Sequence, residues 1–171
     1  AIRLAEQAAA ENSLRDRLIF HSADLRNVKA LFPTGSFDLA VCNPPYYPPG
    51  NGALSADGAR RTARAEVECT LGDVCRAAAY LLRWGGRLCL VHKPERLTDL
   101  LAAMRAHVIE PKRLRFVQPR EGQAPSLVLA EGCRGGKPGL SVDAPLLLQN
   151  PDGSPTVELD AIYFRQQEDT P

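Results

Sequence analysis

Four consecutive residues have the chemical types needed to hold and activate an amino group. Asn43-Pro44-Pro45-Tyr46 directly follows the apolar run 37–42. The side-chain carbonyl of Asn43 and the backbone carbonyl of Pro44 can accept both hydrogens of a planar amino group, which directs its nitrogen lone pair toward an electrophile. The two prolines stiffen the turn, and Tyr46 offers a flat ring on which an unstacked base could lie. Such a site activates an amine without a strong general base.

The structural alternative for this segment is a proline-rich turn, in which Asn43 bonds its own backbone and Tyr46 packs on the surface. The position of this segment at the end of an apolar run favours an amino-group site over the structural turn. Asp24 ends an earlier apolar run, and the carboxyl ends of parallel strands meet in one crevice where ligands bind. His92 ends a third run and could shuttle a proton, although the Lys93-Pro94 pair that follows favours a structural role. We therefore expect the ends of three strands to form one crevice.

The apolar patterns predict the elements that position these residues. We expect helices over 1–11, 25–32, 70–84 and 94–108, and strands over 18–20, 37–42, 87–92 and 126–131. Thr70 and Asp73 form a capping-box pattern at the start of the third helix, and Gly85-Gly86 is expected to end it. The apolar run 37–42 is nearly continuous, as in a parallel sheet that is covered on both faces.

The last third of the chain changes periodicity. Leu114 and Phe116 predict a strand that pairs antiparallel with 126–131 across the turn 119–125, and short apolar runs follow around the turn 150–153. The fold class is therefore α/β, a Rossmann-like and mostly parallel sheet with an antiparallel edge pair. Residues 47–69 lack periodicity, and a loop of that length favours a functional role.

Composition excludes several classes of protein. The 171 residues carry 21 Lys and Arg against 20 Asp and Glu, a formal net charge of +1, so the chain is not a polycation. No apolar run approaches the roughly 20 residues of a membrane helix, and the five cysteines have no zinc or disulfide spacing. We expect no membrane, no metal site and a cytoplasmic location; the oligomeric state is left open.

Basic residues gather in three places: Arg60, Arg61 and Arg64; Lys112, Arg113, Arg115 and Arg120; and Arg134 with Lys137. Charged loops are usually solvated surface. Beside a base-binding turn they favour phosphate contacts, and RNA loops suit this geometry because their bases are already partly unstacked. Trp84, in contrast, is expected to pack in the core.

Several segments together resemble one enzyme family. The Asn-Pro-Pro-Tyr turn is similar to that of amino-methyltransferases that use S-adenosylmethionine. Further likeness lies in 63–66, 85–97 and 131–140, and the chain resembles the bacterial tRNA(Val) adenine-37 N6-methyltransferases over nearly all of its length.

The resemblance implies roles for individual residues. Asn43 and Pro44 would grip the N6 amino group of the target adenine, Pro45 would stiffen the turn, and Tyr46 would stack on the base. Asp24, with Leu25 beside it and Asn43 opposite, would meet the cofactor, S-adenosylmethionine. Asp24 could equally be the N-cap of the helix over 25–32, and both roles are compatible. The implied substrate is tRNA, held through Arg60, Arg61, Arg64, Arg134 and Lys137.

One departure from the family concerns the cofactor. The glycine-rich loop and the ribose-binding acid of the family would precede Ala1, and no Gly-x-Gly pattern here replaces them. We therefore expect residues 1–171 to be the C-terminal portion of one methyltransferase domain. The family's sheet order implies that the two missing strands lie beside each other in the sheet between the strand 18–20 and the strand 37–42, supplied by upstream sequence or in another way such as swapping. Two alternatives stay open: a release-factor glutamine methyltransferase, because a carboxamide presents the same planar NH₂, and a non-catalytic RNA-binding module.

Overall fold

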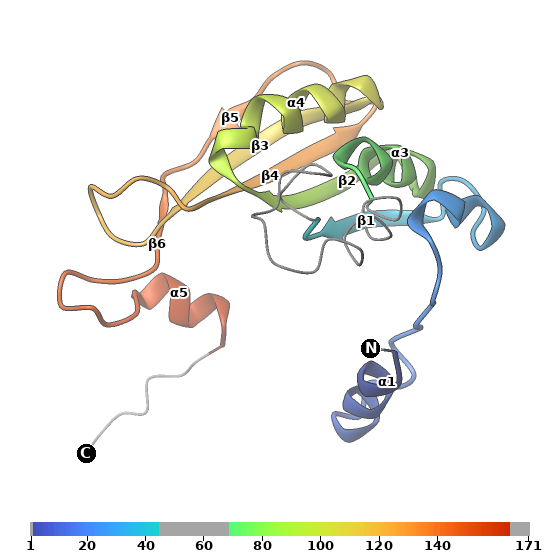
Figure 1. The fold of residues 1–171 in the computed structure, drawn as a ribbon, viewed down its shortest axis with the longest axis horizontal. Coiled ribbons are helices and arrows are strands. Elements are labelled where there is room, and N and C mark those ends of the chain that lie inside the picture. The colour runs from blue at the N-terminus through green and yellow to red at the C-terminus, as the bar shows by residue number, and fades with distance from the viewer. Residues whose placement is uncertain (1, 45–68, 165–171) are drawn as a thin grey trace, which may run out of the picture.

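The computed structural model describes residues 2–44 and 69–164, which form a sheet covered on one face by two helices (Figure 1). Its strands are β1 (Phe37–Cys42), β2 (Leu82–His92), β3 (Ile109–Gln118), β4 (Leu127–Arg134), β5 (Ser141–Val142) and β6 (Leu146–Leu147). Their order is β1-β2-β4-β3-β5, and β6 also pairs with β3. The β1–β2, β3–β5 and β3–β6 pairs are parallel, whereas β4 runs antiparallel to β2 and β3. This confirms the predicted α/β sheet with its antiparallel pair.

The helices are α1 (Ile2–Glu11), α3 (Leu71–Leu81), α4 (Leu97–Ala106) and α5 (Val157–Ile162), with short 3₁₀ turns η1 (Leu25–Ala30) and η2 (Pro94–Arg96). α3 and α4 lie together over the sheet, and α1 lies apart from it (Figure 1). The predicted capping box is present: Asp73 donates its backbone N–H to Thr70 Oγ1 at 3.1 Å, and Asp73 Oδ2 accepts from the Thr70 backbone N–H at 2.9 Å.

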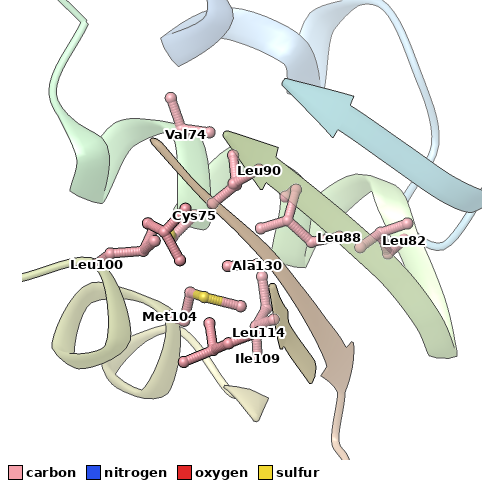
Figure 2. Close-up of a cluster of buried hydrophobic side chains, with 12 residues drawn as sticks. Val74, Cys75, Leu82, Leu88, Leu90, Leu100, Met104, Ile109, Leu114 and Ala130 are labelled. Carbon is pink, nitrogen blue, oxygen red and sulfur yellow. The ribbon is translucent and has the colours of Figure 1, made fainter. Parts of the chain in front are cut away.

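The core fills the space between the two helices and the sheet (Figure 2). Cys75 of α3 and Leu100 and Met104 of α4 are fully buried. They face alternate residues of the strands, such as Leu88 and Leu90, because side chains alternate between the faces of a sheet. This packing fixes β1 and β2 and therefore the ends that carry Asn43 and His92.

The prediction of a strand at 18–20 is wrong. These residues belong to no strand, and Leu18 and Ile19 are 43% and 84% exposed. A strand needs a neighbour to satisfy its backbone, and no described strand lies beside this segment. The two further strands expected between 18–20 and 37–42 are not tested and stay a prediction.

Two helix ends also differ from the prediction. α3 ends at Leu81, before Gly85-Gly86, because Leu82 turns to an extended conformation and enters β2 opposite Phe37. The helix expected over 94–108 ends at Ala106; Val108 takes a left-handed φ of 60°, and Pro111 lies inside β3 instead of at a helix end. α5 was not predicted, although its N-cap Thr156 accepts from the Leu159 backbone N–H.

Only one face of the described sheet is covered. Leu39 and Val41 point away from α3 and α4 and are 54% and 75% exposed. The expectation of cover on both faces therefore does not hold within residues 2–44 and 69–164. The bare face is where the candidate site lies.

Candidate functional site

Asn43 follows β1 and lines a groove on the bare face of the sheet. The groove encloses about 450 Å³. Along β1 the side chains of Leu39 and Val41 share this face, and the alternation of strands puts Asn43 on it as well. The exposed amide thus stands at the carboxyl end of a parallel strand, where the sequence predicts it.

The turn that follows is described only in part. Pro44 is buried beside the exposed Asn43, which fixes the start of the turn against the sheet. Pro45, Tyr46 and the Arg60, Arg61 and Arg64 cluster lie outside the described residues, so their predicted roles stay predictions.

The floor of the groove is apolar. Its lining residues near Asn43 are Val41, Cys89, Val91 and Leu129. Leu129 of β4 pairs with Val91 of β2 and is 37% exposed. A flat apolar floor beside an amide can receive the face of an aromatic ring.

The far side of the groove is charged. Glu131 pairs with Arg87 and Arg113, and Arg113 lies 3.5 Å from Asp143. Arg115 lies opposite Leu129 in the strand register and donates to Glu158 with both terminal nitrogens, at 2.6 and 2.8 Å. These arginines are therefore held in place, with their charge partly neutralised. The sequence predicts Arg113 and Arg115 only as part of a basic cluster with Lys112. Because residues two apart in a strand share a face, the alternation of β3 places both arginines in the groove.

Asp24 is the N-cap of η1, which confirms the structural reading of this residue. Its Oδ1 accepts from the Arg26 backbone N–H at 2.9 Å, and the Arg26 guanidinium donates to both carboxylate oxygens. The hydrogen bonds from Arg26 lower the pKa of Asp24 to about 2. The carboxylate is exposed and ionised, so it can accept a further hydrogen bond. Leu25, the first residue of η1, packs against the core.

The pKa values of two cysteines, Cys69 and Cys42, respond to nearby charge. Burial raises the pKa of Cys69, and the Asp24 carboxylate adds to the rise. Burial likewise raises the pKa of Cys42, with a further contribution from Cys69. Asp24 thus acts on Cys69, and it does not line the groove beside Asn43. Since 18–20 forms no strand and His92 lies in the core, the prediction that three strand ends form one crevice does not hold.

His92 does not line the groove. It is 1% exposed and lies on the core face of β2, while its neighbour Val91 lies on the groove face. Burial lowers its pKa, which keeps the imidazole neutral. This placement favours the structural role over a proton shuttle.

Arg134 and Lys137 lie at the other end of the sheet. Arg134 ends β4, which is antiparallel to β2, and its guanidinium is 5.9 Å from the ring centroid of Trp84 near the start of β2. Trp84 is 67% exposed, so the prediction that it packs in the core is wrong. Trp84 lies in the irregular stretch of β2 between Leu82 and Arg87, which pair with Phe37 and Leu39 near the start of β1, whereas Leu90 pairs with Cys42 at its end. The structure therefore does not bring these residues next to Asn43.

Curated relatives share one activity name. The chain is 30% identical over 169 residues to the tRNA1(Val) (adenine(37)-N6)-methyltransferase of Tolumonas auensis, covering 96% of this chain and 68% of the relative. It is 31% identical over 134 residues to the enzyme of the same name from Porphyromonas gingivalis, covering 77% of this chain and 51% of that protein. The chain thus spans about half to two thirds of the length of these relatives.

A solved structure shares the fold. A predicted O-methyltransferase of Agrobacterium tumefaciens superposes with a TM-score of 0.73 at 20% identity, covering 95% of this chain and 71% of that one. No family model matches the chain. Among the described residues, none of the helices has the length and apolar character needed to cross a membrane.

Proposed function

The chain belongs to the tRNA1(Val) (adenine(37)-N6)-methyltransferase family, and we propose that its protein methylates the N6 amino group of an adenine in tRNA. The proposal extends to the substrate that the relatives' name gives, adenine 37 of tRNA1(Val). The observation that carries it is Asn43, an exposed amide at the end of β1 beside the apolar floor of the groove.

The residues around Asn43 fit a reaction on an amino group. Asn43 would accept one N6 hydrogen through its side-chain oxygen, and the Pro44 backbone carbonyl would accept the other. These contacts orient the nitrogen lone pair and leave the proton to be lost to solvent after transfer. Tyr46 would hold the base by stacking, and Pro45 would keep the turn rigid.

S-adenosylmethionine, the cofactor of this family, supplies an electrophilic methyl group on a sulfonium centre. The described residues fit it at one point: the ionised Asp24 carboxylate is exposed and retains acceptor capacity. Asp24, Leu25 and Asn43 are therefore the proposed cofactor contacts of this chain. The neutral, buried His92 takes no part.

RNA would be held by basic side chains outside the groove. Arg60, Arg61 and Arg64 follow the Asn-Pro-Pro-Tyr turn in the sequence, and Arg134 and Lys137 lie at the opposite end of the sheet. Phosphate contacts of this kind position a substrate and make its binding dependent on salt.

The test is methyl transfer by the full-length protein that carries this sequence. Labelled S-adenosylmethionine is incubated with unmodified tRNA or with a release factor, and the products are digested to nucleosides and amino acids. Label in N6-methyladenosine is expected. Label in glutamine of the release factor would replace the proposal with amide methylation, which the relatives' names do not favour. Binding of tRNA without label would indicate a non-catalytic module.

A further inference from the structure

The end of the sheet opposite Asn43 carries an exposed aromatic ring set among cations. Trp84 is 67% exposed and lies in the stretch of β2 between Leu82 and Arg87, where the register with β1 shifts. A large ring in a strand normally packs against neighbours, because burying it gains free energy. Its exposure therefore needs an explanation beyond packing.

The backbone beneath the ring leaves space for it. Gly135 takes a φ of +67°, and an added Cβ there would lie 2.8 Å from Trp84 Cδ2 and closer still to Cε2 and Cζ2. Glycine at this position thus lets the ring rest against the backbone of the loop that follows β4. The Arg134 guanidinium lies 5.9 Å from the ring centroid and donates to the Leu82 carbonyl, and the ring still keeps 67% of its surface exposed.

Three cations at this end of the sheet, from β3, the end of β4 and the loop after it, form no ion pair among the described residues. They are Arg134, Lys137 and Lys112, and Lys112 Nζ donates to the Lys137 carbonyl at 3.2 Å. Nearby carboxylates are already engaged, since Asp38 pairs with Arg83 and Glu110 with Arg105. The arginines of the groove, in contrast, are paired with Glu131, Asp143 and Glu158, so the charge of these three cations is less neutralised than that of the groove.

We propose that Trp84 is a stacking position for an unpaired base of the RNA substrate, with Arg134, Lys137 and Lys112 contacting the adjacent phosphates. An exposed π-face with flanking cations is the arrangement that binds single-stranded nucleic acid. Leu82, two residues before Trp84, pairs with Phe37, and roughly 16 Å of strand rise separates Phe37 from Cys42, so the base that Trp84 takes differs from the one that is methylated at the Asn43 end. The inference rests on the proposed function for the identity of the RNA.

Trp84 is the single tryptophan of residues 1–171, so the part of the tryptophan emission that is lost in Trp84→Leu reports this position. Unmodified tRNA(Val) transcript is titrated into the protein while tryptophan emission and the anisotropy of end-labelled transcript are recorded. A stacked base is expected to quench the emission with the same midpoint as the anisotropy change. An oligoglutamate peptide serves as the anion without bases and should leave the emission unchanged.

The variants separate stacking from general apolar contact. Trp84→Leu keeps an apolar side chain without a π-face and is expected to weaken transcript binding about tenfold, whereas Trp84→Tyr should retain most of the affinity. Lys137→Ala should reduce the slope of log affinity against log salt by about one unit, as loss of one phosphate contact does. Arg17→Ala, which removes an exposed cation in the segment after α1, is the matched control and should have little effect.

Several results would overturn the proposal: unchanged affinity in Trp84→Leu, equal loss in Arg17→Ala and Lys137→Ala, quenching by the peptide instead of the transcript, or quenching that follows dimerisation of the protein alone. Circular dichroism of each variant shows that the fold is kept, as expected for an exposed side chain. Quenching by tRNA in a protein that transfers no methyl group would preserve this inference and reject the proposed enzyme. Methyl transfer with unaltered emission would do the reverse.

Discussion

Asn43 and His92 end neighbouring parallel strands and lie on opposite faces of the sheet. Asn43 lines the groove, whereas His92 is buried in the core against the helices. Successive residues of a strand point to opposite faces of the sheet, so Val91 faces the groove while its neighbour His92 faces the core. Chemistry at Asn43 is therefore separated from the imidazole by the sheet itself.

Stability is expected to fall at acidic pH through His92. Burial lowers its pKa below the usual 6.5, with smaller effects from the charged side chains of Glu95, Arg96 and Asp99. The unfolded chain then binds a proton that the folded chain does not, so the stability present above about pH 6.5 is lost as the pH falls. Urea unfolding at pH 7.5 and 5.5 measures this loss.

His92→Gln should reduce that pH dependence of unfolding, while leaving the pH profile of methyl transfer unchanged in shape. His21→Gln, which removes an exposed imidazole, is the control and should keep the dependence of the unaltered chain. A changed pH profile of methyl transfer in His92→Gln alone would restore the proton-shuttle interpretation.

The effects of substitutions at Gly132 and Met104 on the free energy of unfolding are expected to be strongly coupled. A Cβ added at Gly132 would lie 2.6 Å from Ile109 Cγ2 and closer still to Met104 Cε. Gly132→Ala should therefore destabilise the fold by about 1–3 kcal/mol through overpacking. Met104→Ala should cost about 2–5 kcal/mol, because it leaves a cavity at a fully buried site.

The double variant of Gly132 and Met104 should lose less stability than the sum of the two single losses, since each change relieves the other. Chemical denaturation of all four proteins gives this coupling energy. Simple additivity would show that α4 shifts to accommodate the added methyl group.

Thr70→Ala is expected to lower stability by about 1 kcal/mol. The change removes the acceptor that Asp73 uses at 3.1 Å and a hydroxyl that donates to the Asp73 carboxylate at 2.6 Å. Thr70→Ser keeps both interactions and should stay near the stability of the unaltered chain. Equal melting temperatures for the two variants would mean that packing of α3, and not its cap, determines the end of the helix.

The sequence predicts the elements that are determined by capping residues or by the spacing of apolar residues. The capping box of α3, the apolar run of β1 and the antiparallel pairing of β3 with β4 are local or periodic patterns, and all three are found. The end of α3 was missed because Leu82 continues the helical apolar stripe, and its entry into β2 is decided by pairing with Phe37. The prediction for residues 18–20 fails for a related reason, since an apolar run forms a strand only where a neighbouring strand pairs with it.

The sequence predicts the site residues that lie at the end of an element, but not those that strand pairing brings to the groove. Asn43 and Asp24 were located because each directly follows or caps an element. Arg115 lies opposite Leu129 because of the register of the β3–β4 pair, and no local pattern reveals that register. Trp84 packs against Gly135, which is 51 residues later in the chain. Contacts of such long sequence separation account for what was missed.

Asn43→Ala in the full-length protein is expected to lower the turnover of methyl transfer by about 10²–10³, because one preorganised acceptor of the amino group is lost. Asn43→Asp keeps an acceptor oxygen at the same position and should retain more activity than the alanine variant. Since Asn43 is exposed, neither change should alter the unfolding midpoint by more than a surface substitution does.

Leu129→Ala distinguishes activation from binding in the same groove. It shortens the apolar floor opposite Val91 without touching the amide, so it should raise the KM for tRNA more than it lowers kcat, whereas Asn43→Ala should act mainly on kcat. Single-turnover methyl transfer with saturating tRNA separates the two effects. Undiminished turnover in Asn43→Ala would remove this residue from the reaction and leave the groove as a binding surface.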